Sequence, residues 1–84
     1  LLNKATTESL ISQILKNDPE ETHALLVIDI DNFKSVNDTD GHAVGDRAIR
    51  AIGKLLFSTF RQSDIMGRIG GDEFAVLMVN VKTP

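Results

Sequence analysis

The chain contains no cysteine, no long apolar run and no excess of basic residues, and each absence excludes a class of protein. Without cysteine, its 84 residues can form neither a disulfide framework nor a thiolate metal site, which fits a reducing compartment. The longest apolar stretch, Ala24 to Ile28, is too short to span a bilayer, and no secretory leader opens the chain. We therefore expect a cytoplasmic location, with any membrane anchor lying elsewhere in a parent protein.

The charge balance argues against a protein that binds duplex nucleic acid. The formal net charge is -3, whereas such proteins carry a basic face. A nucleotide site stays possible, because a bound metal ion reverses the field locally. Eighty-four residues allow one small domain with a modest core. The abrupt start at Leu1 and the end just after an apolar run suggest a piece of a longer protein.

The first half of the chain predicts one helix, one strand and a loop. A stripe of apolar residues at helical spacing predicts a helix from Thr6 to Lys16, which ends before Pro19. The run from His23 to Ile30 does not alternate, which favours a strand covered on both faces. The polar stretch 31–41 is predicted as a loop with at most one helical turn, at Phe33 to Val36.

The second half predicts a long helix and a hairpin. Apolar residues follow a 3.6-residue period from Ala43 to Phe60. Two short strands, Asp64 to Ile69 and Glu73 to Val81, are joined through Gly70-Gly71. The fold class expected is therefore α/β (α+β), a sandwich of helices on a mainly antiparallel sheet in the order helix, strand, helix, hairpin. The outer edge of such a small sheet needs further chain to cover it.

Two acidic clusters are the candidates for chemistry. Asp29-Ile30-Asp31 follows the apolar strand, and Asp72-Glu73 follows the two glycines at the predicted hairpin tip. Carboxylates at a strand end and at a neighbouring hairpin tip can converge above one sheet edge, where α/β proteins commonly bind ligands. Without cysteine or paired histidine, such a cluster favours a hard cation such as Mg²⁺. Either cluster alone is equally what an ordinary loop cap or Gly-Gly turn contains.

Four ordered motifs together resemble the GGDEF domain of diguanylate cyclases. Residues 70–74 spell Gly-Gly-Asp-Glu-Phe, and residues 29–34 match the family's D-x-D-x-F-K. Residues 37–46 match its N-D-x-x-G-H-x-x-G-D, and residues 1–4 resemble the tail of its opening motif, with Lys4 where arginine is usual. The resemblance implies a GGDEF or nucleotidyl-cyclase-like sandwich. Because that domain is roughly twice this length, residues 1–84 are expected to be a truncated GGDEF domain.

The resemblance implies a metal and catalytic site at the two acidic clusters. Asp29 and the carbonyl of Ile30 would bind the metal, Mg²⁺ or Mn²⁺, together with Asp72 and Glu73. One of the last two would help to deprotonate the attacking 3′-hydroxyl, and the sequence does not divide these roles between them.

The resemblance also implies a GTP site. Phe33 and Lys34 would lie beside the triphosphate, and Asn37 and Asp46 would read the guanine edge. A carboxylate accepts from guanine N1–H and the 2-amino group, and an amide both donates and accepts, so adenine would be rejected.

Arg61-Gln62-Ser63-Asp64 precedes Gly70 at the spacing of the family's inhibitory R-x-x-D site, where the product binds. Arginine suits phosphate and the guanine face, and aspartate accepts from the base. The plainer interpretation is a surface ion pair at a helix end, which contributes little to stability.

The function implied is condensation of two GTP into cyclic di-GMP with release of pyrophosphate, inhibited by the product. It requires a homodimer, and the parent chain would carry a regulatory sensory domain. Two alternatives stay open. One is a non-catalytic module that binds cyclic di-GMP or GTP, and the other is a truncated fragment without activity that only mediates dimerisation.

Overall fold

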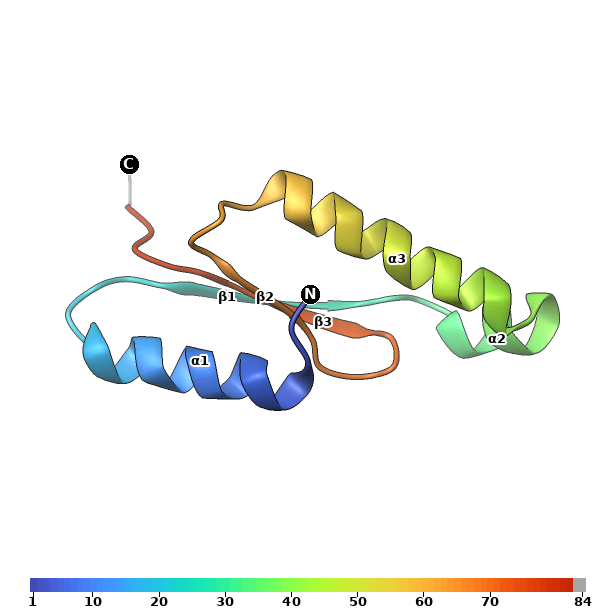
Figure 1. Ribbon diagram of the computed structural model, residues 1–84, viewed down its shortest axis with the longest axis horizontal. Coiled ribbons are helices and arrows are strands. Elements are labelled where there is room, and N and C mark those ends of the chain that lie inside the picture. The colour runs from blue at the N-terminus through green and yellow to red at the C-terminus, as the bar shows by residue number, and fades with distance from the viewer. Residues whose placement is uncertain (83–84) are drawn as a thin grey trace.

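A computed structural model describes residues 1–82 of the chain (Figure 1). Three helices and three strands form two layers of helix around one sheet. In chain order they are α1 (Lys4–Asn17), β1 (Ala24–Asp29), α2 (Phe33–Asp40), α3 (His42–Thr59), β2 (Ile65–Arg68) and β3 (Glu73–Met78). The expected α/β class and the expected order are confirmed, with α2 as an addition.

The prediction of a loop over residues 31–41 was wrong, because α2 occupies most of it. Asn32, in the left-handed conformation at φ 59°, turns the chain into the helix, and Gly41 at φ 89° ends it. The helix has no buried residue and packs against α3. It depends on this tertiary contact, which a short polar segment does not reveal in its sequence.

The three strands form an antiparallel sheet in the order β1-β3-β2. Figure 1 shows the sheet between α1 on one side and α3 on the other. The α3 face holds the main core, in which buried side chains come from α3 and the two hairpin strands. These core residues are Ile49, Leu56, Met66, Phe74 and Val76.

The other face of the sheet is only partly covered. Helix α1 packs on β2, where buried Thr7 lies against Gly67. On β1, by contrast, Leu25 is 58% exposed and Val27 is 60% exposed. The prediction that this strand is covered on both faces was therefore wrong for the structure described, since its burial alternates residue by residue.

The hairpin strands are also shorter than predicted. β3 ends at Met78 and not at Val81, because the Val79 N–H bonds to the Asp64 side chain and Asn80, at φ 52°, leaves the extended conformation. Within residues 1–82, no helix combines the length and the apolar composition needed to cross a membrane.

Candidate functional site

The sheet brings the two acidic clusters together, as the sequence predicts. In the ladder between β1 and β3, Asp29 stands opposite Glu73. The ladder continues one step beyond the strands, where the Ile30 N–H donates to the Asp72 carbonyl at 2.9 Å. Two segments that lie more than forty residues apart in the chain are thus fixed side by side by backbone hydrogen bonds.

The carboxylates at this edge share one electrostatic field. The pKa of Asp29 is raised above its ordinary value by loss of hydration, by the charge of Asp72 together with a hydrogen bond between the two side chains, and by the charge of Asp31. The backbone at Ile30 opposes the shift. Because Asp29 is itself exposed, the neighbouring carboxylates are the main physical reason for its raised pKa. A raised pKa means that negative charge is concentrated here, which a cation would relieve.

The hairpin tip is held by its own backbone and by one arginine. Both the Ile69 and Gly70 N–H groups donate to the Glu73 carbonyl, at 2.9 and 3.3 Å. The Arg68 guanidinium donates to the carbonyls of Gly70 and Gly71, at 3.2 and 2.7 Å. Arg68 therefore fixes the turn that presents the acidic pair.

The donor set suits a hard cation that retains other ligands. Among residues 1–82, no three side chains of His, Cys, Asp or Glu converge closely enough to enclose a metal on their own. The oxygens available are those of the acidic clusters and of the Ile30 carbonyl. Mg²⁺ is usually bound by one or two carboxylates, with water and substrate phosphates completing its shell. The residues present fit that mode of binding.

A second feature lies where α2 packs on α3. The Asn37 Oδ1 atom is buried and has no hydrogen-bond partner. It lies against the backbone of Gly45, so close that a Cβ built there would be 1.8 Å away, with the Phe33 ring 3.3 Å from the same point. An unpaired buried acceptor is costly, and such groups in proteins commonly await a ligand or water. Asp46, the next residue along α3, is exposed, as is Lys34 on α2.

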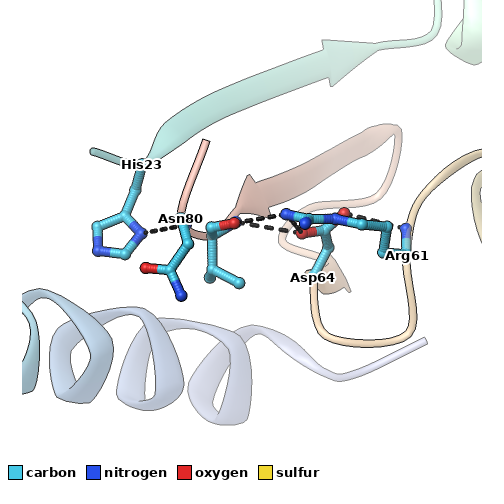
Figure 2. Close-up of polar contacts among 5 residues, drawn as sticks. His23, Arg61, Asp64 and Asn80 are labelled. Carbon is cyan, nitrogen blue, oxygen red and sulfur yellow. Dashed lines mark hydrogen bonds and ion pairs between the residues drawn. The ribbon is translucent and has the colours of Figure 1, made fainter. Parts of the chain in front are cut away.

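Arg61 and Asp64 form an ion pair that reaches the end of β3 (Figure 2). The Asp64 carboxylate accepts from the Arg61 N–H at 3.0 Å, the Arg61 guanidinium at 3.2 Å and the Val79 N–H at 3.1 Å. The guanidinium also donates to the Val79 carbonyl. The Asp64 side chain is 3% exposed and that of Arg61 60%, so arginine is the accessible half of the pair.

These hydrogen bonds decide the charge state of Asp64. Burial alone would raise the pKa of Asp64, but the N–H groups of Val79 and Arg61 and the Arg61 guanidinium outweigh it and lower that pKa. On the other side of the β3 exit, the Asn80 N–H donates to His23 Nδ1 at 3.1 Å (Figure 2). The segment that follows β3 is therefore hydrogen-bonded to Asp64 on one side and to His23 on the other.

Comparison with known proteins matches the whole chain to a single protein family. The family described as "Diguanylate cyclase, GGDEF domain" matches residues 1–84. The probable diguanylate cyclase DgcE of Escherichia coli K12 is 44% identical over 80 residues, which are 93% of this chain and 7% of that protein.

Solved structures agree with the fold. The GGDEF domain of TpbB (YfiN) from Pseudomonas aeruginosa, solved on its own, superposes with a TM-score of 0.91 at 41% identity. The match covers 99% of this chain and 49% of that one. The GGDEF domain of DgcB from Caulobacter crescentus, solved in complex with c-di-GMP, gives a TM-score of 0.91 at 29% identity, over 99% and 48% of the two chains. The chain thus spans about half of these solved chains and far less of the curated relative.

Proposed function

Because the chain belongs to the GGDEF domain family of diguanylate cyclases, we propose that it forms the metal-binding and guanine-binding part of a domain that makes cyclic di-GMP from two GTP. The observation that carries this proposal is the convergence of the two acidic clusters at one sheet edge, with the pKa of Asp29 raised by loss of hydration and by its neighbour Asp72. Metal-assisted phosphoryl chemistry requires such a concentration of oxygen ligands.

In this proposal Asp29, Asp72, Glu73 and the Ile30 carbonyl hold Mg²⁺ or Mn²⁺. The ion supplies neutralisation of the negative charge on the phosphates. The protein contributes position. The β1–β3 ladder fixes Asp29 opposite Glu73, and the Arg68 guanidinium fixes the turn before them. Asp72 or Glu73 takes the proton of the attacking 3′-hydroxyl.

The guanine base is read between α2 and α3. The unpaired Asn37 Oδ1 supports this assignment, because a guanine N–H would supply the donor that the fold does not. Asp46 would accept from the same edge of the base. Gly45 leaves the room that the Asn37 side chain occupies. Phe33 and Lys34, at the start of α2, would lie beside the triphosphate.

Reaction requires two such domains, each with one GTP. Each 3′-oxygen forms a bond to the α-phosphorus of the other nucleotide while the bond to pyrophosphate breaks, and the hydroxyl proton passes to the acidic pair. Positioning two bound nucleotides in this way is the principal catalytic task. A homodimer in a cytoplasmic location, governed by a sensory domain in the parent protein, completes the proposal.

The test uses the full-length parent protein, because the chain spans about half of the solved domains. We expect the parent with GTP and Mg²⁺ to yield cyclic di-GMP and pyrophosphate, and Asp72→Ala to abolish both. Glu20→Ala, at an exposed carboxylate in the α1–β1 connection, is the matched control and should retain activity. Turnover that survives in Asp72→Ala would overturn the site assignment.

A second function is a cyclic di-GMP site at Arg61, and it rests on the exposed guanidinium held on a buried carboxylate. We propose that this site carries product inhibition in an active parent and would be the whole function of a non-catalytic one. Calorimetry with cyclic di-GMP should show binding that Arg61→Ala removes. Arg47→Ala, at an exposed arginine of α3, should leave binding intact. Binding unaffected by Arg61→Ala would place the ligand elsewhere.

A further inference from the structure

The turn that precedes the acidic pair is not held by a conformation that only glycine adopts. Neither Gly70 nor Gly71 has a positive φ, in contrast to Gly41 at the end of α2. Glycine nevertheless loses more backbone freedom on folding than any other residue. Two glycines in succession therefore make a flexible turn unless other groups restrain it.

Arg68 supplies that restraint from a backbone that is itself fixed on both sides. In the ladder between β2 and β3, Arg68 stands opposite Phe74, which is fully buried. On the other side of β2, the Arg68 N–H donates to the Leu2 carbonyl at 2.9 Å. From this base the guanidinium reaches the carbonyls of both glycines of the turn, Gly70 and Gly71. Its planar fork holds two acceptors in a fixed geometry, which a flexible ammonium group does not.

The hydrogen bonds of Arg68 complete those of the hairpin tip. The carbonyls of Asp72 and Glu73 accept from backbone N–H groups, so the fold holds them without any side chain. Among residues 1–82, the two carbonyls before them are held by the Arg68 guanidinium. Loss of that side chain would therefore free the first half of the turn and leave the second half bonded.

Arg68 restrains the turn without neutralising the carboxylates beside it. Within residues 1–82, the ion pair found joins Arg61 to Asp64. The Arg68 guanidinium thus bonds to peptide carbonyls and pairs with neither Asp72 nor Glu73. An arginine that paired with these carboxylates would compete with a metal ion for the same oxygens. The observed arrangement leaves them available to a cation.

We propose that Arg68 is a positioning residue of the metal site, and that its guanidinium sets the affinity for Mg²⁺ or Mn²⁺ by holding the Gly70-Gly71 turn. This role rests on the proposed function, because Asp72 and Glu73 are metal ligands only within that proposal. Groups that orient metal ligands without touching the ion change metal affinity by roughly 10–100-fold when they are lost.

Binding of Mn²⁺ alone to the full-length parent tests this role, with the free ion measured by electron paramagnetic resonance. We expect Arg68→Ala to raise the dissociation constant for Mn²⁺ by roughly tenfold or more. Arg68→Lys keeps the charge but not the fork, so its dissociation constant should also be raised. Arg47→Ala, at an exposed arginine of α3, is the matched control and should bind Mn²⁺ as the unsubstituted protein does. Full Mn²⁺ affinity in Arg68→Lys would show that charge alone is needed and would overturn the proposal.

Steady-state kinetics with GTP distinguish positioning from a general loss of structure. At saturating Mn²⁺, kcat of Arg68→Lys should fall because the acidic pair is less well placed. Its KM for GTP should change little, since the proposed guanine site lies between α2 and α3. Circular dichroism should match that of the unsubstituted protein. A raised KM with an unchanged kcat, or a loss of folded structure in both Arg68 variants, would overturn the positioning role.

Asp72→Ala separates failure of this role from failure of the proposed function. If Asp72→Ala loses Mn²⁺ while Arg68→Ala binds it as tightly as the unsubstituted protein, the role of Arg68 alone is overturned. If Asp72→Ala still binds Mn²⁺ at full affinity, the proposed metal site is wrong, and the role of Arg68 fails with it.

Discussion

The Asn37 side chain and the Gly45 backbone are in direct contact, and a Cβ at Gly45 would lie 1.8 Å from Asn37 Oδ1. The contact joins α2 to α3 at the proposed guanine site. It also gives a physical reason for glycine at this position of a helix, where alanine is otherwise preferred by about 1 kcal/mol.

Gly45→Ala should therefore displace Asn37 and weaken GTP binding. Loss of one base-reading hydrogen bond corresponds to about 1–2 kcal/mol, or roughly tenfold in the dissociation constant. Calorimetric titration with GTP and Mg²⁺ measures it. Gly53→Ala is the matched control on the same helix, because its new Cβ meets only the flexible end of Leu1, at 3.1 Å. If the two variants bind GTP equally well, Asn37 is not positioned by Gly45 for the base.

A second glycine contact predicts a change in stability. A Cβ at Gly67 on β2 would lie 1.8 Å from Thr7 Oγ1, and Thr7 is a fully buried residue of α1. Gly67→Ala should destabilise the chain by about 1–3 kcal/mol through overpacking. Urea unfolding measures the loss. The double variant with Thr7→Ala should recover part of it, because the smaller side chain makes room. Simple additivity of the two losses would contradict the contact.

Some of the site could be predicted from the sequence, because local patterns determine it. Asp29 ends an apolar run and Asp72 follows two glycines, so a strand end and a hairpin tip were both expected. The exposure of Leu25 and Val27 could not be foreseen, since an unbroken apolar run gives no sign that α1 packs mainly on β2. Likewise, the hydrogen bond from the Val79 N–H to the Asp64 carboxylate spans 15 residues and depends on how the hairpin packs.

The hydrogen bonds of Asp64 predict an acid-sensitive stability. Its pKa is lowered in the folded chain, so the carboxylate contributes stability above its unfolded pKa of about 3.9, and that contribution is lost as pH falls through the lower folded pKa. Asp64→Asn should cost about 1–3 kcal/mol at pH 7, because buried donors lose a charged acceptor. It should also flatten the fall in stability below pH 4. Unfolding free energies measured from pH 7 to pH 2.5 test both. If the unfolding free energy of Asp64→Asn falls with pH as steeply as that of the unsubstituted chain, other carboxylates are responsible for the acid sensitivity.

The pKa of Asp29 is shifted in the opposite direction from that of Asp64. This difference allows metal binding at Asp29 to be distinguished from its effect on folding stability. Its pKa is raised by loss of hydration and by the charges of Asp72 and Asp31, so its ionised form costs stability at neutral pH and the cost disappears as pH falls through the raised pKa. Without metal, the melting temperature of Asp29→Asn should therefore be no lower than that of the unsubstituted 84-residue chain at pH 7.

With Mg²⁺ added, the unsubstituted chain should instead melt at a higher temperature than Asp29→Asn. A ligand that binds only the folded state stabilises it. Mg²⁺ should therefore raise the melting temperature of the unsubstituted chain, and chelation of the ion should remove the increase. Asp29→Asn should respond weakly, since an amide is a poorer ligand than a carboxylate for this hard cation. Asp40→Asn, at an exposed carboxylate at the end of α2, should show the same Mg²⁺-induced rise in melting temperature as the unsubstituted chain. An equal Mg²⁺ shift in all three proteins would mean that the ion binds away from the β1–β3 edge.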